Sequence, residues 1–113
     1  MLSLSLYMLQ RLSALVMVPL VVAHIALMIY AIADGLTASE ILDRTRGSVA
    51  WFAFYGLFVV AVSIHGAIGL RVIVSEWFAI GRGAADVMTW SVGLVLLALG
   101  MRAVWGVTFG VGA

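Results

Sequence analysis

The sequence predicts an all-α integral membrane protein with three transmembrane helices. Its 113 residues are 65% hydrophobic and only 10% charged, and its mean hydropathy is +1.25. A soluble globular chain carries about 25% charged residues and about 45–50% apolar ones. Three long and largely uncharged apolar runs follow each other along the chain. Together these features predict a single transmembrane domain over residues 1–113.

The first apolar run, Leu12–Ala33, is about 22 residues long, which is enough to cross a hydrocarbon core of about 30 Å as a helix. We expect this helix over about residues 8–33, ended by the turn signal at Asp34-Gly35. The polar loop 34–47 follows. Within it, Thr37 or Ser39 could cap a short amphipathic helix that has Glu40 in its first turn and lies along the membrane surface.

The second run, Ser48–Leu70, predicts a helix over about residues 48–77. A short glycine-containing hairpin, Ala79–Asp86, leads to the third run. That run, Val87–Val111, predicts a helix over about residues 86–110. Arg102 interrupts it near its end, from where a long side chain can reach the membrane surface.

Composition excludes several classes of function. The chain has no cysteine, so thiolate-held zinc, iron–sulfur clusters, disulfides and covalently attached c-type haem are excluded. The net charge of +1 gives no sign of a polyanionic partner, and we expect no nucleic acid.

The two histidines, His24 and His65, each lie inside an uncharged apolar run. An ionisable side chain at membrane depth is costly and is by default a candidate site. Neutral imidazole is also the commonest metal ligand in proteins. Two such histidines on different helices, with arginines near one end of the bundle, favour a b-type haem protein.

The two histidines are expected at different depths. Arg11 starts the first span and Arg71 ends the second, so both should lie at one membrane face. His24 lies 13 residues from Arg11, about 20 Å, and His65 lies six residues from Arg71, about 9 Å. A separation of roughly 10 Å prevents both from ligating one haem between these helices. Either each ligates its own haem or only one is a ligand, and the opposite axial ligand comes from another chain.

Small residues surround His65 on its helix: Ser63, Gly66, Ala67 and Gly69. A flat macrocycle needs such residues beside its ligand, and Arg71 or Arg11 could reach its propionates near the membrane surface. In the alternative interpretation, the glycines only allow close helix packing, and His65 hydrogen-bonds a neighbouring helix. An interhelical hydrogen bond is likewise the alternative for His24.

The segment His65-Gly66-Ala67-Ile68-Gly69-Leu70-Arg71, followed by Glu76, resembles a motif of the membrane-anchor (cytochrome b) subunits of succinate dehydrogenase and related fumarate reductases. In that family the second helix carries His-x-x-x-Gly-x-Arg and then an acidic residue. Gln10-Arg11-Leu12-Ser13-Ala14 is similar to the His-Arg-x-Ser-Gly motif of the first helix, with Gln10 in place of the histidine. The three-helix layout and the short length also match.

The resemblance implies half of a heterodimeric haem-binding helix bundle. His65 then becomes an axial ligand of a haem b iron, Arg71 a propionate contact, and Arg11 a propionate or quinone contact. Some members carry a second haem held by first-helix histidines, which makes His24 a candidate ligand of a second haem iron. One haem or two stays open. The implied quinone contacts are Tyr7, Arg11, Ser13 and Trp77.

The implied function is electron transfer to quinone in succinate:quinone oxidoreductase, within the tricarboxylic acid cycle and electron transport, at the cell inner membrane. The chain is not catalytic alone. An iron–sulfur subunit and a flavoprotein subunit would dock on the face of Arg11, Arg71 and Arg82, and a second membrane-anchor subunit in the lipid bilayer would supply the opposite axial ligand.

Several alternatives stay open. The chain could be a quinone-facing cytochrome b of another dehydrogenase, or a haem-free membrane scaffold protein. Neither the quinone type nor the direction, succinate oxidation or fumarate reduction, follows from the residues.

Overall fold

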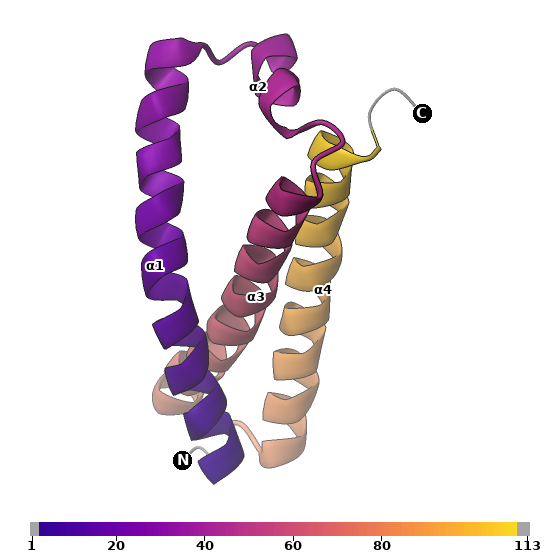
Figure 1. The fold of residues 1–113 in the computed structure, drawn as a ribbon. Helices are drawn as coiled ribbons and strands as arrows, with labels where there is room; N and C mark the ends of the chain where they lie inside the picture. Colours follow the sequence, from indigo (N-terminus) through magenta and orange to yellow (C-terminus); the bar gives the residue numbers. More distant parts are fainter. Residues whose placement is uncertain (1–2, 111–113) are drawn as a thin grey trace.

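A computed structural model describes residues 3–110 and forms four helices in that range (Figure 1): α1 (Leu4–Asp34), α2 (Ala38–Thr45), α3 (Val49–Trp77) and α4 (Arg82–Thr108). Three of them, α1, α3 and α4, are long and apolar enough to cross a membrane. This confirms the predicted all-α membrane fold. The helix α3 packs against α4 and against α1, and α1 diverges from the other two toward the end where α2 lies (Figure 1).

The helix ends differ from the sequence-based expectation at two places. α1 begins at Leu4 rather than near residue 8, because the Ser3 hydroxyl accepts the Leu6 amide hydrogen at 3.3 Å and caps the helix. α4 begins at Arg82 and ends at Thr108 rather than spanning about 86–110. The predicted hairpin over residues 79–86 is therefore wrong, since the connection is only residues 78–81. The end of the predicted run, residue 111, lies outside the described residues.

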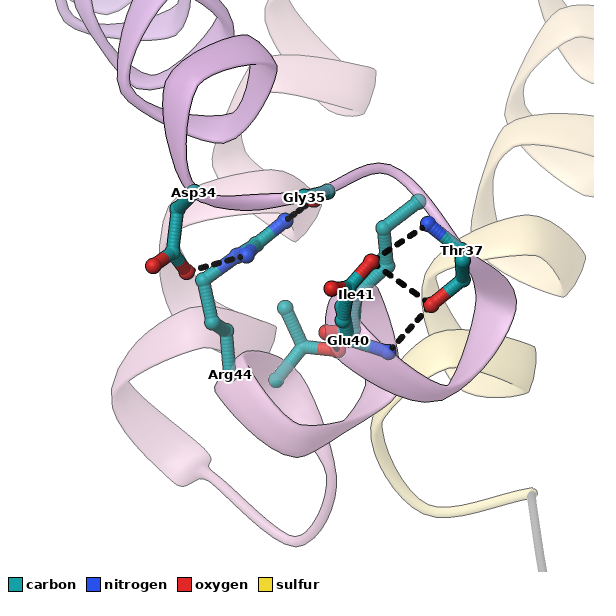
Figure 2. A network of polar contacts seen from close by, with 7 residues as sticks. Asp34, Gly35, Thr37, Glu40, Ile41 and Arg44 are labelled. Carbon is teal, nitrogen blue, oxygen red and sulfur yellow. Dashed lines mark hydrogen bonds and ion pairs between the residues drawn. The ribbon is translucent and has the colours of Figure 1, made fainter.

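The predicted short helix in the polar loop is confirmed as α2 (Figure 2). Thr37 caps it: its hydroxyl accepts the Glu40 amide hydrogen at 3.2 Å, while the Glu40 carboxylate accepts the Thr37 amide hydrogen at 2.9 Å. Hydrogen bonds from the Thr37 hydroxyl and backbone lower the pKa of the Glu40 carboxyl. Arg44 donates to the Asp34 carboxylate at 2.9 Å and to the Gly35 carbonyl at 3.1 Å, which fixes α2 to the end of α1.

The end of α2 and the link that follows it hydrogen-bond to the last carbonyls of α4. The Thr45 hydroxyl donates to the Val107 carbonyl at 2.7 Å, and the Gly47 amide donates to the Thr108 carbonyl at 2.7 Å. The last carbonyls of a helix have no partner within the helix. These two bonds therefore satisfy acceptors at the end of α4. Gly47 reaches this position with a φ of +71°, which glycine adopts without strain.

Small residues let α3 and α4 pack closely. A Cβ added to Gly100 of α4 would lie 2.5 Å from a methyl carbon of Val59 on α3, and one added to Gly93 would lie 3.4 Å from the Ala67 Cβ. Small residues at such crossings are typical of transmembrane helix pairs, because close approach of the backbones increases van der Waals contact. This contact holds α3, the helix that carries His65.

Candidate functional site

His65 meets α1 at Ser13. The distance from Ser13 Oγ to His65 Nδ1 is 3.4 Å, and Ser13 Oγ also donates to the Gln10 carbonyl at 3.0 Å. Ser13 is buried, with 6% of its surface exposed, and the imidazole is half-buried. The interhelical hydrogen bond that the sequence offered as an alternative for His65 is thus present.

His65 also lines an apolar groove of about 330 Å³ beside α1. All the other side chains of this groove are apolar and belong to α1: Ala14, Met17, Val18, Val21 and Val22. Much of the wall is open to the outside, since 63% of the surface of Val18 is exposed. The imidazole therefore lies where a flat apolar group inserted from outside could meet it.

Two polar side chains extend the face of α1 that forms this groove. Tyr7, Arg11, Ala14 and Val18 follow each other at intervals of three or four residues, which places them on one helix face. The Arg11 guanidinium lies over the Tyr7 ring, 5.0 Å from its centre. A cation and a phenol thus stand at the end of the groove nearer to the N-terminus of α1.

Arg71 faces a different cavity. Its Nη1 donates to the Asp86 carboxylate at 2.7 Å and to the Thr89 hydroxyl at 3.2 Å, both on α4. These three residues line a cavity that α3 and α4 form with the first turns of α1, and His65 is not among its lining residues. The structure therefore brings Ser13 and His65 together and directs Arg71 away from them.

The two glycines near His65 have packing partners. A Cβ added to Gly69 would lie 3.5 Å from the Gln10 side-chain nitrogen, and one added to Gly66 would lie 3.5 Å from a methyl of Leu96. Both glycines thus make room for a side chain of a neighbouring helix, as expected if their role is close helix packing. The Gln10 Oε1 atom is buried and has no hydrogen-bond partner within residues 3–110.

His24 lies between aromatic rings of α3. Its ring is 5.3 Å from the Phe58 ring and 6.4 Å from the Tyr55 ring, both edge to face. His24 lines two cavities of about 360 Å³ and about 510 Å³. The first lies among α1, α2 and α3 and includes Arg44, and the second lies among α1, α3 and α4.

The histidines lie at different levels of the bundle, as expected. On α1, His24 follows Ser13, the partner of His65, by 11 residues, about 16 Å. On α3, Phe58 precedes His65 by seven residues, about 10 Å. Two imidazoles this far apart along the bundle do not meet the same iron.

The sequence did not reveal Asp86 as the partner of Arg71. The sequence does place Asp86 near the start of the next helix, at the same membrane face as Arg71, and this could have indicated the ion pair. Of the remaining predicted quinone contacts, Trp77 is 79% exposed and Tyr7 is 45% exposed. The roles of all these residues toward a cofactor stay predictions.

Comparison with known proteins adds one finding. The family model described as the succinate dehydrogenase/fumarate reductase transmembrane subunit matches residues 2–104, nearly the whole chain. No curated protein and no solved structure matches the chain.

Proposed function

Because the chain belongs to the succinate dehydrogenase/fumarate reductase transmembrane subunit family, we propose that it is a haem b-binding anchor in a succinate:quinone oxidoreductase. As a multi-pass membrane protein it would attach the iron–sulfur and flavoprotein subunits to the cell inner membrane. It would also form part of the path by which electrons reach quinone.

The observation that carries this proposal is the position of His65. Its imidazole lines an apolar groove that is open at the surface of the chain. Within residues 3–110 its one hydrogen-bond partner is Ser13, at Nδ1. His65 would supply one axial ligand from this chain. A second anchor subunit would then cover the groove and supply the opposite axial ligand.

The residues of the groove fit a haem. Apolar side chains such as Val18 and Val21 suit the macrocycle and exclude water from its face. Arg11, on the same face of α1 as Val18, can form a charge-assisted contact with a propionate. We assign this contact to Arg11 in preference to Arg71, whose guanidinium is held by Asp86 of α4 in a cavity that His65 does not line. Bound haem supplies one-electron chemistry at a potential that its ligands and burial tune.

The quinone would bind at the same end of the bundle. The Tyr7 phenol and the Arg11 guanidinium lie together there, and both can donate hydrogen bonds to a quinone carbonyl. Arg82 begins α4 and is exposed at this end as well. We propose that the soluble subunits dock on this face, which brings their iron–sulfur centre near the quinone.

His24 could bind a second haem, and this assignment is tested separately from that of His65. The cavities on either side of His24 and its position roughly 10–16 Å from the level of His65 suit a second group farther from the soluble subunits. The aromatic neighbours Tyr55 and Phe58 also suit a histidine packed without any cofactor. Haem counting distinguishes the two.

The test is a pyridine haemochromogen assay with a parallel flavin assay on the gently purified native complex. We expect haem b in the wild-type complex, and His65→Ala should remove one haem per flavin while the complex still assembles. His24→Phe is the matched variant, since it replaces the other membrane histidine. Loss of a second haem in that variant would assign His24 as a ligand, and full haem content would leave it a packing residue.

Two results would count against the proposal. An assembled complex with flavin but no haem would make this chain a haem-free anchor of the same family. Unchanged haem content in His65→Ala would place the haem elsewhere.

A further inference from the structure

On the basis of the function proposed above, we propose that Ser13 is a positioning residue for the axial ligand His65. Its hydroxyl oxygen accepts a hydrogen bond from Nδ1–H of the imidazole. This bond fixes the tautomer in which Nε2 carries a free electron pair, the form that can bind iron. Ser13 thereby acts behind the ligand and not as a quinone contact.

The direction of the hydrogen bonds follows from counting hydrogens. A serine hydroxyl has one hydrogen to donate and two electron pairs to accept with. Ser13 Oγ lies 3.0 Å from the Gln10 carbonyl oxygen and 3.4 Å from His65 Nδ1. A carbonyl oxygen can only accept, and the contact to it is the shorter one, so we assign the hydroxyl hydrogen to that contact. With this assignment the oxygen accepts from His65, and Nδ1 carries the hydrogen of the longer contact.

The opposite direction of the hydrogen bond, from the Ser13 hydroxyl to Nδ1, would leave His65 in a tautomer that cannot bind iron. If the Ser13 hydrogen pointed to Nδ1, the imidazole hydrogen would be on Nε2 and that nitrogen could not bind a metal. Among the described residues, no other side chain that lines the groove can fix the tautomer of His65, since the α1 side chains there are apolar. The burial of Ser13, with 6% exposed, keeps bulk water from competing for either contact.

The hydrogen bond should also tune the iron. An acceptor on Nδ1–H raises the basicity of a ligating imidazole and fixes its orientation. A more basic ligand favours the oxidised metal, so removal of Ser13 should raise the haem midpoint potential. Loss of such a supporting contact typically costs about 10–100-fold in metal affinity, so haem should also be retained less tightly.

The first experiment reads the tautomer directly. The full chain is labelled with ¹⁵N-histidine, reconstituted in lipid bilayers without haem and examined by solid-state NMR. With only two histidines in the chain, the spectrum of His65→Ala assigns both. We expect a protonated Nδ1 at His65 in the wild type and a changed signal in Ser13→Ala. A wild-type His65 protonated on Nε2, or a His65 signal unchanged in Ser13→Ala, would overturn the inference.

The second experiment uses the native complex and a matched control. Thr108→Val also removes a buried hydroxyl, one that donates to the Val104 carbonyl at 2.7 Å within α4 and makes no hydrogen bond to His65 in the described residues. We expect Ser13→Ala to raise the haem midpoint potential, to alter the electron paramagnetic resonance spectrum of the ferric haem and to lower haem retention about 10-fold. Thr108→Val should leave all three at wild-type values.

The outcomes separate this inference from the proposed function. A wild-type complex that contains no haem refutes the function proposed above, while the NMR experiment still decides whether Ser13 holds the tautomer. A complex with haem in which Ser13→Ala and Thr108→Val have the same potential and spectrum refutes the role of Ser13 and leaves the haem assignment intact.

Discussion

Replacement of Gly100 by alanine should loosen the pair of helices that holds His65 in place. The added Cβ would lie 2.5 Å and 3.0 Å from the two methyl carbons of Val59, whereas non-bonded carbons are most stable at about 3.5–4.0 Å. Val59 is β-branched and has one strongly preferred rotamer in a helix. Its methyls therefore move aside only if the rotamer changes or if α3 and α4 separate by about 1 Å.

The magnitude follows from a comparison with Gly106 on the same helix. Within residues 3–110, a Cβ added there would have no side chain and no other helix within 4 Å, so Gly106→Ala changes helix propensity without a clash. Both variants gain the same propensity term, about 1 kcal/mol at most. The difference between their free energies of unfolding therefore isolates the overpacking cost at Gly100, which should be about 1–3 kcal/mol.

The assay is a titration of the full chain in mixed micelles with sodium dodecyl sulfate, followed by far-ultraviolet circular dichroism and tryptophan fluorescence. We expect the Gly100→Ala transition at lower detergent fraction than the wild type, and the Gly106→Ala transition at or above it. Equal stability of the two variants would refute the close α3–α4 contact from which the cost is derived.

Two further predictions concern the loop that joins α1 to α3. Hydrogen bonds from Thr37 lower the pKa of Glu40 from its ordinary value of 4.5, so this contribution to the stability of α2 is present above that pH and is lost as pH falls through the lowered value. Protection of the Ile41 amide against hydrogen exchange, corrected for the intrinsic rate, should fall over that range in the wild type and not in Glu40→Gln. In Thr45→Val the Val107 carbonyl loses its 2.7 Å donor without a change in side-chain shape. The free energy of unfolding should fall by about 1–3 kcal/mol in the same detergent titration, and no change would show that the carbonyl finds another donor.

The membrane spans and α2 were predictable because their signals are local. A continuous apolar run long enough to cross the bilayer has few other solutions, since backbone polar groups must be satisfied within the segment. The Thr37 and Glu40 pair has the spacing of a capping box, and it forms one. The start of α4 was placed too late because Gly81 and Gly83 suggested a turn. Gly81 instead precedes the helix, and its carbonyl accepts the Ala85 amide hydrogen at 3.0 Å.

The site was harder to predict because its geometry depends on how the helices are rotated. An apolar transmembrane helix has almost no polar face to indicate which side meets its neighbour. His65 and Ser13 were both recognised from motifs, yet nothing in the sequence shows that they touch. Arg71 was grouped with His65 because the two belong to one motif and because Arg71 was expected near the membrane surface. Neighbours on one face of a helix are three or four residues apart, so two residues that are six apart lie on different faces. This spacing could have shown that Arg71 does not share the face of His65.

The exposed side of α1 is the side that the proposed second anchor subunit would cover. Ser13 points toward α3, and Val18 and Val22, at 63% exposure each, continue the face on which Arg11 lies. Tyr7 and Arg11 stand at one end of this face, at the level of the membrane surface, where a tyrosine and an arginine anchor a helix and can also meet a partner. Closure of the groove by a second chain would bury His65 and the valines together and would leave Arg11 at the rim, where it can still meet both a carboxylate and water.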